Sequence, residues 1–181
     1  GFDYLSSFYS IKTNAKAIGF KLLFHQALTG ENALAWRYLA DNPDIHIVSA
    51  KRENLLEVVC SYSKARATNQ WHSTQEIDSP PQLMVPIENC ARLFQRFSKA
   101  SEVLAKIKKT HQVLEVDYQT VCADFTGSMD RIFNFLELDA KVESTPLLKK
   151  IARDLPCDEL VNYDELKNHF ANTAYGKYFC Y

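Results

Sequence analysis

Residues 45–72, which read IHIVSAKRENLLEVVCSYSKARATNQWH, constrain the fold of this chain more than any other stretch. A short apolar run at 45–48 predicts a buried strand, and apolar residues at helical spacing predict a helix over 53–67. The basic pair Lys51 and Arg52 lies between them. A strand that leads through a short turn into a helix is the repeating unit of α/β sheets. The stretch therefore predicts an α/β fold with two positive charges at the end of a strand.

The rest of the chain continues this alternation of elements. We predict further strands over 17–24 and 112–116, and further helices over 31–40, 87–109, 128–136 and 158–171. Residues 1–16 have a mixed pattern that predicts no element. This order favours a single domain over residues 1–181, in which a mostly parallel sheet is flanked by helices.

Polar side chains follow each of the three predicted strands. His25 follows the first strand, Arg52 the second and Tyr118 the third. Ligands of parallel α/β sheets bind at the carboxyl ends of the strands, where these residues would lie. We therefore expect a polar binding site that includes all three.

The turn at Arg52 suits a phosphate group. Free N–H groups and a partial positive charge at a helix N-terminus attract anions, and the planar guanidinium of arginine adds parallel hydrogen bonds. Ser61 or Ser63, further along the predicted helix, would add a hydroxyl donor. The alternative is that Arg52 forms a surface ion pair with Glu53 or another neighbouring carboxylate.

Composition and charge narrow the function classes. The formal net charge is −1, so no global field attracts nucleic acid or an acidic membrane. The five cysteines form no CxxC or Cys/His cluster, so we expect no metal site. No apolar run approaches the roughly 18 residues that a membrane span requires, and no secretory signal is visible, which favours a cytoplasmic protein.

The stretch around Arg52 resembles the PAPS-dependent sulfotransferase family in its bacterial, nodulation-type branch. That branch has a strand, a basic residue with Arg, an acidic residue and Asn, and then a Leu-Leu helix with a Ser, an Ala, a Thr and a Trp. The corresponding residues here are Lys51, Arg52, Glu53, Asn54, Leu55, Leu56, Ser61, Ala65, Thr68 and Trp71. In the family, the Arg and the helix Ser hold the 3′-phosphate of the nucleotide. The resemblance therefore assigns this role to Arg52 and Ser61, or to Ser63 if the register shifts by two.

Other segments resemble the same family in their order and spacing. The run VLEVDY ends at Tyr118, whose family counterpart lies near the adenine, although the acidic residue that follows there is Gln119 here. Residues 129–138 resemble the helix that follows in the family, and residues 160–166 and 173–175 resemble the C-terminal end of the branch. Residues 19–22 and 25–26 resemble the family's second strand. The resemblance implies a P-loop-transferase-like sulfotransferase fold, PAPS as co-substrate with PAP as its product, and no metal.

The opening element of the family has no counterpart in this sequence. In the family, the first strand leads into a Ser/Thr/Gly-rich loop, related to the P-loop, that binds the 5′-phosphosulfate. Neither residues 29–30 nor residues 125–128 have that pattern, and Gly1 would lie downstream of the loop. We therefore expect an N-terminally truncated domain with weak or no sulfuryl transfer of its own, whose activity a supplied N-terminal segment would restore.

The resemblance also implies an acceptor that bears a hydroxyl, either a small molecule or a carbohydrate. A hydroxyl nucleophile must lose its proton, and a histidine near the equivalent strand end is the base in the animal cytosolic branch, which makes His25 the candidate base. Lys21 is a candidate to reach the sulfate. The alternatives are a hydrogen-bonded structural role for His25 and a partly buried structural role for Lys21.

Two other functions stay open at this point. The chain could be a non-catalytic remnant that binds PAP or another nucleotide, or another P-loop-type transferase such as a small-molecule kinase. A kinase would need a Walker lysine and magnesium carboxylates, which the sequence does not place. A missing first strand would leave a sheet edge exposed, which favours a homo-oligomer.

Overall fold

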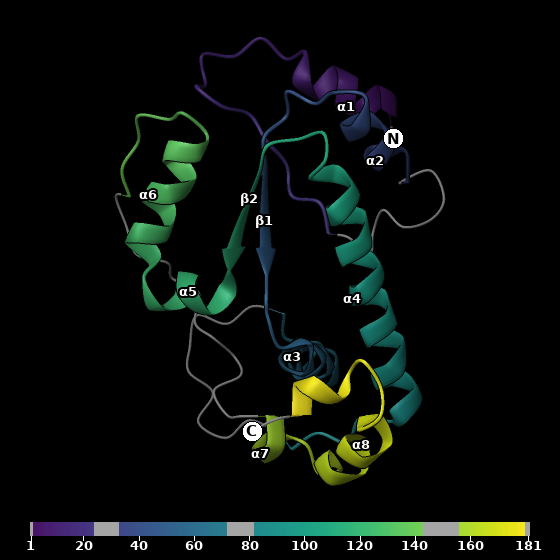
Figure 1. Cartoon of the computed structure of the whole chain (residues 1–181). Coiled ribbons are helices and arrows are strands. Elements are labelled where there is room, and N and C mark those ends of the chain that lie inside the picture. Colours follow the sequence, from purple (N-terminus) through teal and green to yellow (C-terminus); the bar gives the residue numbers. More distant parts are fainter. Residues whose placement is uncertain (1, 24–32, 72–81, 143–155, 180–181) are drawn as a thin grey trace. The chain divides into compact units, whose positions relative to one another are not determined.

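The computed structural model describes residues 2–23, 33–71, 82–142 and 156–179 (Figure 1). Within these ranges the fold is mixed α/β, with helices dominating and a small parallel sheet, so the predicted α/β class is confirmed. The chain divides into two compact units, Gly1–Lys51 with Ser98–Glu143 and Arg52–Phe97 with Ser144–Tyr181. The long helix α4 (Ile87–Ile107) contributes its N-terminal part to the second unit and its C-terminal part to the first.

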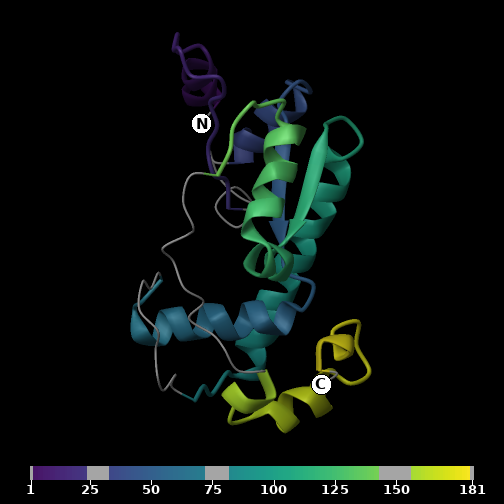
Figure 2. The same ribbon diagram turned by 90° about the vertical axis from the view of Figure 1, so that its left-hand side faces the viewer.

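The first unit contains the two parallel strands β1 (Ile47–Lys51) and β2 (Val113–Asp117). Ile47 pairs with Val113 and Lys51 with Asp117, so the carboxyl ends of both strands lie level. Figures 1 and 2 show helix α6 (Phe125–Phe135) on one face of this pair and the C-terminal part of α4 on the opposite face. Helices on both faces are the usual cover of parallel strands.

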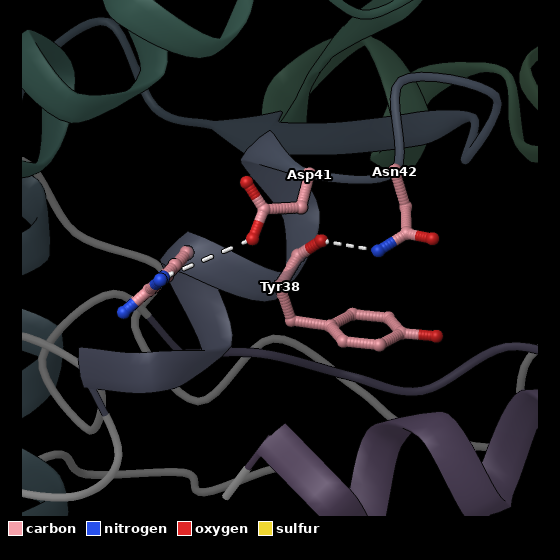
Figure 3. Close-up of polar contacts among 4 residues, drawn as sticks. Tyr38, Asp41 and Asn42 are labelled. Atoms are coloured by element: carbon pink, nitrogen blue, oxygen red, sulfur yellow. Dashed lines mark hydrogen bonds and ion pairs between the residues drawn. The ribbon is translucent and has the colours of Figure 1, made fainter.

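Two short helices, α1 (Phe2–Tyr9) and α2 (Leu34–Ala40), pack together in the same unit. Leu5 of α1 is buried against α2, and the ring of Tyr9 stacks on that of Tyr38 with centroids 6.0 Å apart. Helix α2 ends where the side-chain amide of Asn42 donates to the Tyr38 carbonyl at 2.7 Å (Figure 3). The ion pair between Arg37 and Asp41, at 3.8 Å, lies on the same turn and is exposed.

The predicted strand over 17–24 is wrong for residues 17–23, which form no regular element. Phe20 and Lys21 are exposed there. A strand needs a neighbour that satisfies its backbone N–H and C=O groups, and among the described strands β1 and β2 pair only with each other. Helix α1, by contrast, forms in a stretch for which the sequence predicts no element, because contacts with α2 bury one of its faces.

The second unit consists of α3 (Leu55–Thr68), the N-terminal part of α4, α7 (Pro156–Glu159), α8 (Tyr163–Phe170) and the 3-10 helix η3 (Gly176–Phe179). Its hydrophobic core takes buried residues from α3, α4, α8 and η3, among them Leu56, Val59, Leu93, Phe94, Leu166, Phe170 and Phe179, and the partly buried Cys157 of α7 packs against this core. Helix α3 confirms the helix predicted over 53–67 to within two residues at either end.

A short parallel bridge splits the helix that the sequence predicts over 158–171. The Leu83 N–H donates to the Glu159 carbonyl at 2.8 Å, and the Val161 N–H donates to the Leu83 carbonyl at 2.9 Å. The side chain of Asn162 then accepts from the Val85 N–H at 3.2 Å and donates to the Val85 carbonyl at 3.0 Å. These bonds use backbone groups that a continuous helix would need, so α7 ends at Glu159 and α8 begins at Tyr163.

Candidate functional site

The turn that precedes α3 has the geometry of a capped helix N-terminus. Asn54 is the N-cap, with an extended backbone (φ −88°, ψ 107°), and its side-chain oxygen accepts from the Leu56 N–H at 2.8 Å. The cap satisfies one of the amides that a helix start leaves without an intrahelical partner. Arg52 is partly buried two residues before the cap. The sequence therefore folds so that a guanidinium belongs to the turn that opens a 14-residue helix.

Lys51, the neighbour of Arg52, is held by the sheet of the first unit. Its Nζ lies 3.1 Å from Oε2 of Glu115 on the adjacent strand, and Lys108 also contacts the Glu115 carboxylate. Hydrogen bonds from Lys108 and Lys51 hold the pKa of Glu115 below its ordinary value. The charge of Lys51 is therefore compensated within the first unit, whereas Arg52 belongs to the second unit with α3.

Ser61 and Ser63, the two candidate hydroxyl donors, lie on different sides of α3. Each helical residue advances by about 100°, so the two serines are about 200° apart. Ser63 lies one turn beyond Val59 and Cys60, which are 0% and 1% exposed, whereas Ser61 lies one turn beyond the partly exposed Glu57. Both serines are partly buried. A shift of two residues in the register of the family motif would therefore change the side of the helix that carries the donor.

The remaining predicted site residues lie in the first unit or outside the described ranges. Tyr118 is partly buried and opens helix α5 (Tyr118–Ala123), which Asp117 caps by accepting from the Thr120 N–H at 3.0 Å. Lys21 is exposed in an irregular segment, so its expected position on a strand is wrong, and so is the alternative of a partly buried lysine. His25 lies outside the described residues. Arg52, Ser61 and Ser63 thus share one unit, and Tyr118 and Lys21 share the other.

A buried ion pair between Lys64 and Glu159 is the strongest polar feature that the sequence analysis missed. The Lys64 Nζ lies 2.9 Å from Oε1 of Glu159, and the two side chains are 0% and 2% exposed. Burying either charge alone would cost several kcal/mol, roughly, so each needs the other. Lys64 lies one turn beyond the buried Cys60, and this position in the apolar stripe of α3 was the available signal. That signal indicates a buried partner, but it does not indicate which carboxylate.

The buried cysteines of the second unit are inert thiols. Burial raises the pKa of Cys60 to about 12, with Glu159 adding to the effect, and burial raises the pKa of Cys90 to about 12 as well. Over the described part of the chain, no group of three or more His, Cys, Asp or Glu residues could hold a metal ion. Among the described helices, none combines the length and the apolar character that a bilayer crossing demands.

A surface depression of about 580 Å³ lies at the C-terminal end of α6, where Phe133, Asn134 and Lys141 are part of its lining. None of the predicted site residues contributes to it. The turn at Arg52 therefore remains the candidate site, because it combines a cation with a helix N-terminus.

Comparison with known proteins shows that this α/β chain has distant relatives. It is similar to nodulation protein H of Rhizobium meliloti and to nodulation protein H of Rhizobium meliloti strain 1021. Each is 25% identical over 140 residues, which cover 76% of this chain and 57% of the relative. The chain thus spans somewhat more than half the length of the curated relatives that it matches. No family model and no solved structure matches it. The similarity is that of a distant relationship.

Proposed function

We propose that this chain is part of a PAPS-dependent sulfotransferase and that it holds the 3′-phosphate of the nucleotide at Arg52 and the N-terminus of α3. Two features of the chain together carry the proposal. The chain is distantly similar to nodulation protein H, and the segment that resembles the sulfotransferase motif forms an arginine-bearing turn before a capped helix. A P-loop-transferase-like fold is part of this proposal.

The chemistry of the turn supports a doubly charged anion. An arginine fork binds two oxygens of one phosphate, and hydrogen bonds to charged groups contribute about 1.5–3 kcal/mol each. The helix N-terminus adds amide donors and about half a positive charge. Ser61 would supply a hydroxyl; it is partly buried and lies one turn before Lys64 and Ala65, which are 0% and 6% exposed. Tyr118 would lie near the adenine.

The transfer step needs groups beyond this turn. We propose His25 as the base that takes the proton of the acceptor hydroxyl, and Lys21 as a cation near the sulfate. The acceptor class is a hydroxyl-bearing small molecule or carbohydrate. The sequence holds no P-loop-type segment for the 5′-phosphosulfate. Removing even one hydrogen-bond donor that stabilises the transferring group lowers the rate of a reaction of this kind by about 10²–10³. We therefore expect this chain alone to bind PAP and to transfer sulfate weakly or not at all.

Ligand discrimination tests the proposal. Thermal unfolding is followed with PAP, with AMP, and with ATP plus Mg²⁺. We expect stabilisation by PAP alone, because AMP and ATP lack a 3′-phosphate. Stabilisation by ATP with Mg²⁺ but not by PAP would contradict the proposal and favour a small-molecule kinase.

A second assay separates an enzyme from a remnant that only binds nucleotide. This alternative is favoured by the limited span of the match, 57% of each relative. The chain is incubated with ³⁵S-labelled PAPS and a panel of phenols, alcohols and oligosaccharides, with and without the N-terminal segment of nodulation protein H. Labelled product supports the enzyme. PAP binding without product under both conditions favours the remnant.

A further inference from the structure

Two hydrogen bonds of the Asn54 side chain connect distant parts of the second unit. Its side-chain oxygen accepts from the Leu56 N–H at 2.8 Å, and its side-chain nitrogen donates to the Tyr178 carbonyl at 3.1 Å. Capping alone requires only an acceptor, which serine, threonine or aspartate would supply equally well. An asparagine also carries an amide donor. One side chain therefore both opens α3 and joins it to η3, which lies 124 residues further along the chain.

The partner of this bond is itself well anchored. Phe179, the residue after Tyr178, is 1% exposed and stacks on Phe170 with ring centroids 5.8 Å apart. The hydroxyl of Tyr163 donates to the Phe179 carbonyl at 2.8 Å. Consecutive carbonyls of η3 thus accept hydrogen bonds from two distant segments of the chain, one from the cap of α3 and one from helix α8.

We propose that Asn54 is a positioning residue that couples the C-terminal segment Gly176–Phe179 to the turn that carries Arg52, and so orients the guanidinium for the phosphate. This inference rests on the proposed function. Only Arg52, Glu53 and Asn54 lie between the last residue of β1 and the first residue of α3. A turn this short moves with its cap, because few backbone dihedrals separate Arg52 from Asn54. A cation that is held in its binding orientation loses less conformational entropy when the anion arrives.

The coupling predicts that substitutions at Asn54 and Tyr163 change phosphate binding, although neither side chain has to contact the phosphate. Asn54→Ser keeps a neutral capping oxygen but removes the donor that reaches Tyr178. Tyr163→Phe removes the bond to the adjacent carbonyl of η3, that of Phe179, and changes no residue of the turn. Asn89→Ser, on an exposed position of α4 in the same unit, is the matched control for the chemical change. All variants are made in the 181-residue chain, and their PAP affinity is measured by calorimetry at a temperature where melting curves show each to be folded.

We expect Asn54→Ser and Tyr163→Phe each to weaken PAP binding about fivefold or more, which is the loss that corresponds to one hydrogen bond. The double variant should bind no more weakly than Asn54→Ser alone, because η3 acts on the turn through Asn54. Asn89→Ser should bind as the wild type does. Wild-type affinity in Asn54→Ser, or losses that multiply in the double variant, would overturn the inference.

Failure of the proposed function gives a different result. If the wild type does not bind PAP, the proposed function is wrong and the coupling is judged by amide hydrogen exchange. Asn54→Ser should then speed exchange at residues 52–54 and 176–179 together, while Asn89→Ser leaves both segments unchanged. Unchanged exchange at residues 176–179 in Asn54→Ser would overturn the coupling as well.

Discussion

Lys51 and Arg52 are adjacent in the sequence but serve different parts of the molecule. Lys51 lies at the end of β1 and pairs with Glu115 of β2, whereas Arg52 belongs to the unit that contains α3. Of these two cations, Arg52 is therefore the one that shares a unit with α3. On α3 itself, Ser61 and Ser63 lie on different sides and Lys64 is committed to a buried partner. A substitution at one of these residues therefore tests a single role, either ligand binding or stability.

The two serines form a matched pair of variants. Ser61→Ala should weaken PAP binding about tenfold, because a hydroxyl that donates to a charged phosphate contributes at least about 1.5 kcal/mol. Ser63→Ala, on the side of Val59 and Cys60, should leave the affinity unchanged. Calorimetric titration of both variants measures this difference. The reverse pattern would place the donor at Ser63 and shift the motif by two residues.

The buried ion pair should matter for stability rather than for ligand contact. Lys64→Met leaves the Glu159 carboxylate buried without its cation, so we expect the free energy of unfolding to fall by about 3–5 kcal/mol. The double variant Lys64→Met with Glu159→Leu should recover most of this loss, because no charge then remains buried. Urea denaturation of the single and double variants tests the account. A loss below about 1 kcal/mol in Lys64→Met would show that the pair contributes little.

At the scale of elements, periodic segments were predictable and tertiary contacts decided the rest. Helices α3 and α4 follow from apolar spacing alone, and β1 and β2 follow from short apolar runs that find each other as partners. The run at 17–23 fails as a strand because sequence does not reveal whether a neighbour exists. Helix α6 begins at Phe125 rather than 128, because Asp124 caps it by accepting from the Gly127 N–H at 2.9 Å. The break between α7 and α8 depends on Leu83, more than 70 residues away, and no local pattern records it.

The candidate site was also predictable from sequence only in part. The motif around Arg52 was recognisable because its residue types follow one another at fixed spacing, and the predicted helix start was found. The bond from Asn54 to Tyr178 and the pair of Lys64 with Glu159 join residues 124 and 95 positions apart, so they emerge only in three dimensions.

The pairing of β1 with β2 should depend on pH. Lys108 and Lys51 lower the pKa of Glu115 from its ordinary value of 4.5, so the carboxylate stabilises the folded state above that pH. This contribution is lost as the pH falls through the lowered value in the folded protein. Glu115→Gln should reduce stability by about 0.2–1 kcal/mol at pH 7, the range for partly exposed pairs, and the difference from wild type should be smaller at pH 3 than at pH 7. Denaturant unfolding at both pH values checks this, and an equal difference at pH 3 would contradict it.

At the scale of the whole molecule, the residues that the structure describes form two hydrophobic clusters, one in each unit. Cys60 and Cys90 lie in the cluster of the second unit, whereas Cys122 is exposed in the first. The thiols therefore report on the second unit separately from the first. Because α3 forms part of that cluster, they also report on the element that carries the candidate site.

Thiol chemistry should follow this division. At pH 8, Cys122 should react with iodoacetamide at once, and Cys60 and Cys90 should react only when the core of the second unit opens. Because burial raises both pKa values from 9.0 to about 12, their contribution to stability is complete below pH 9 and is lost as the pH rises from 9 towards 12. Mass spectrometry of labelled peptides tests the order of reaction. Rapid labelling of Cys60 in the folded protein would contradict the buried core.

The most direct test of the central claim is a calorimetric titration of PAP into the wild type, Arg52→Ala and Arg66→Ala. Arg66 is exposed in the last turn of the same helix, so its removal changes the net charge equally. We predict that the wild type binds PAP, that Arg52→Ala binds at least about tenfold more weakly, and that Arg66→Ala binds as the wild type does. Equal losses in both variants, or no binding by the folded wild type, would contradict the assignment of Arg52 to the 3′-phosphate.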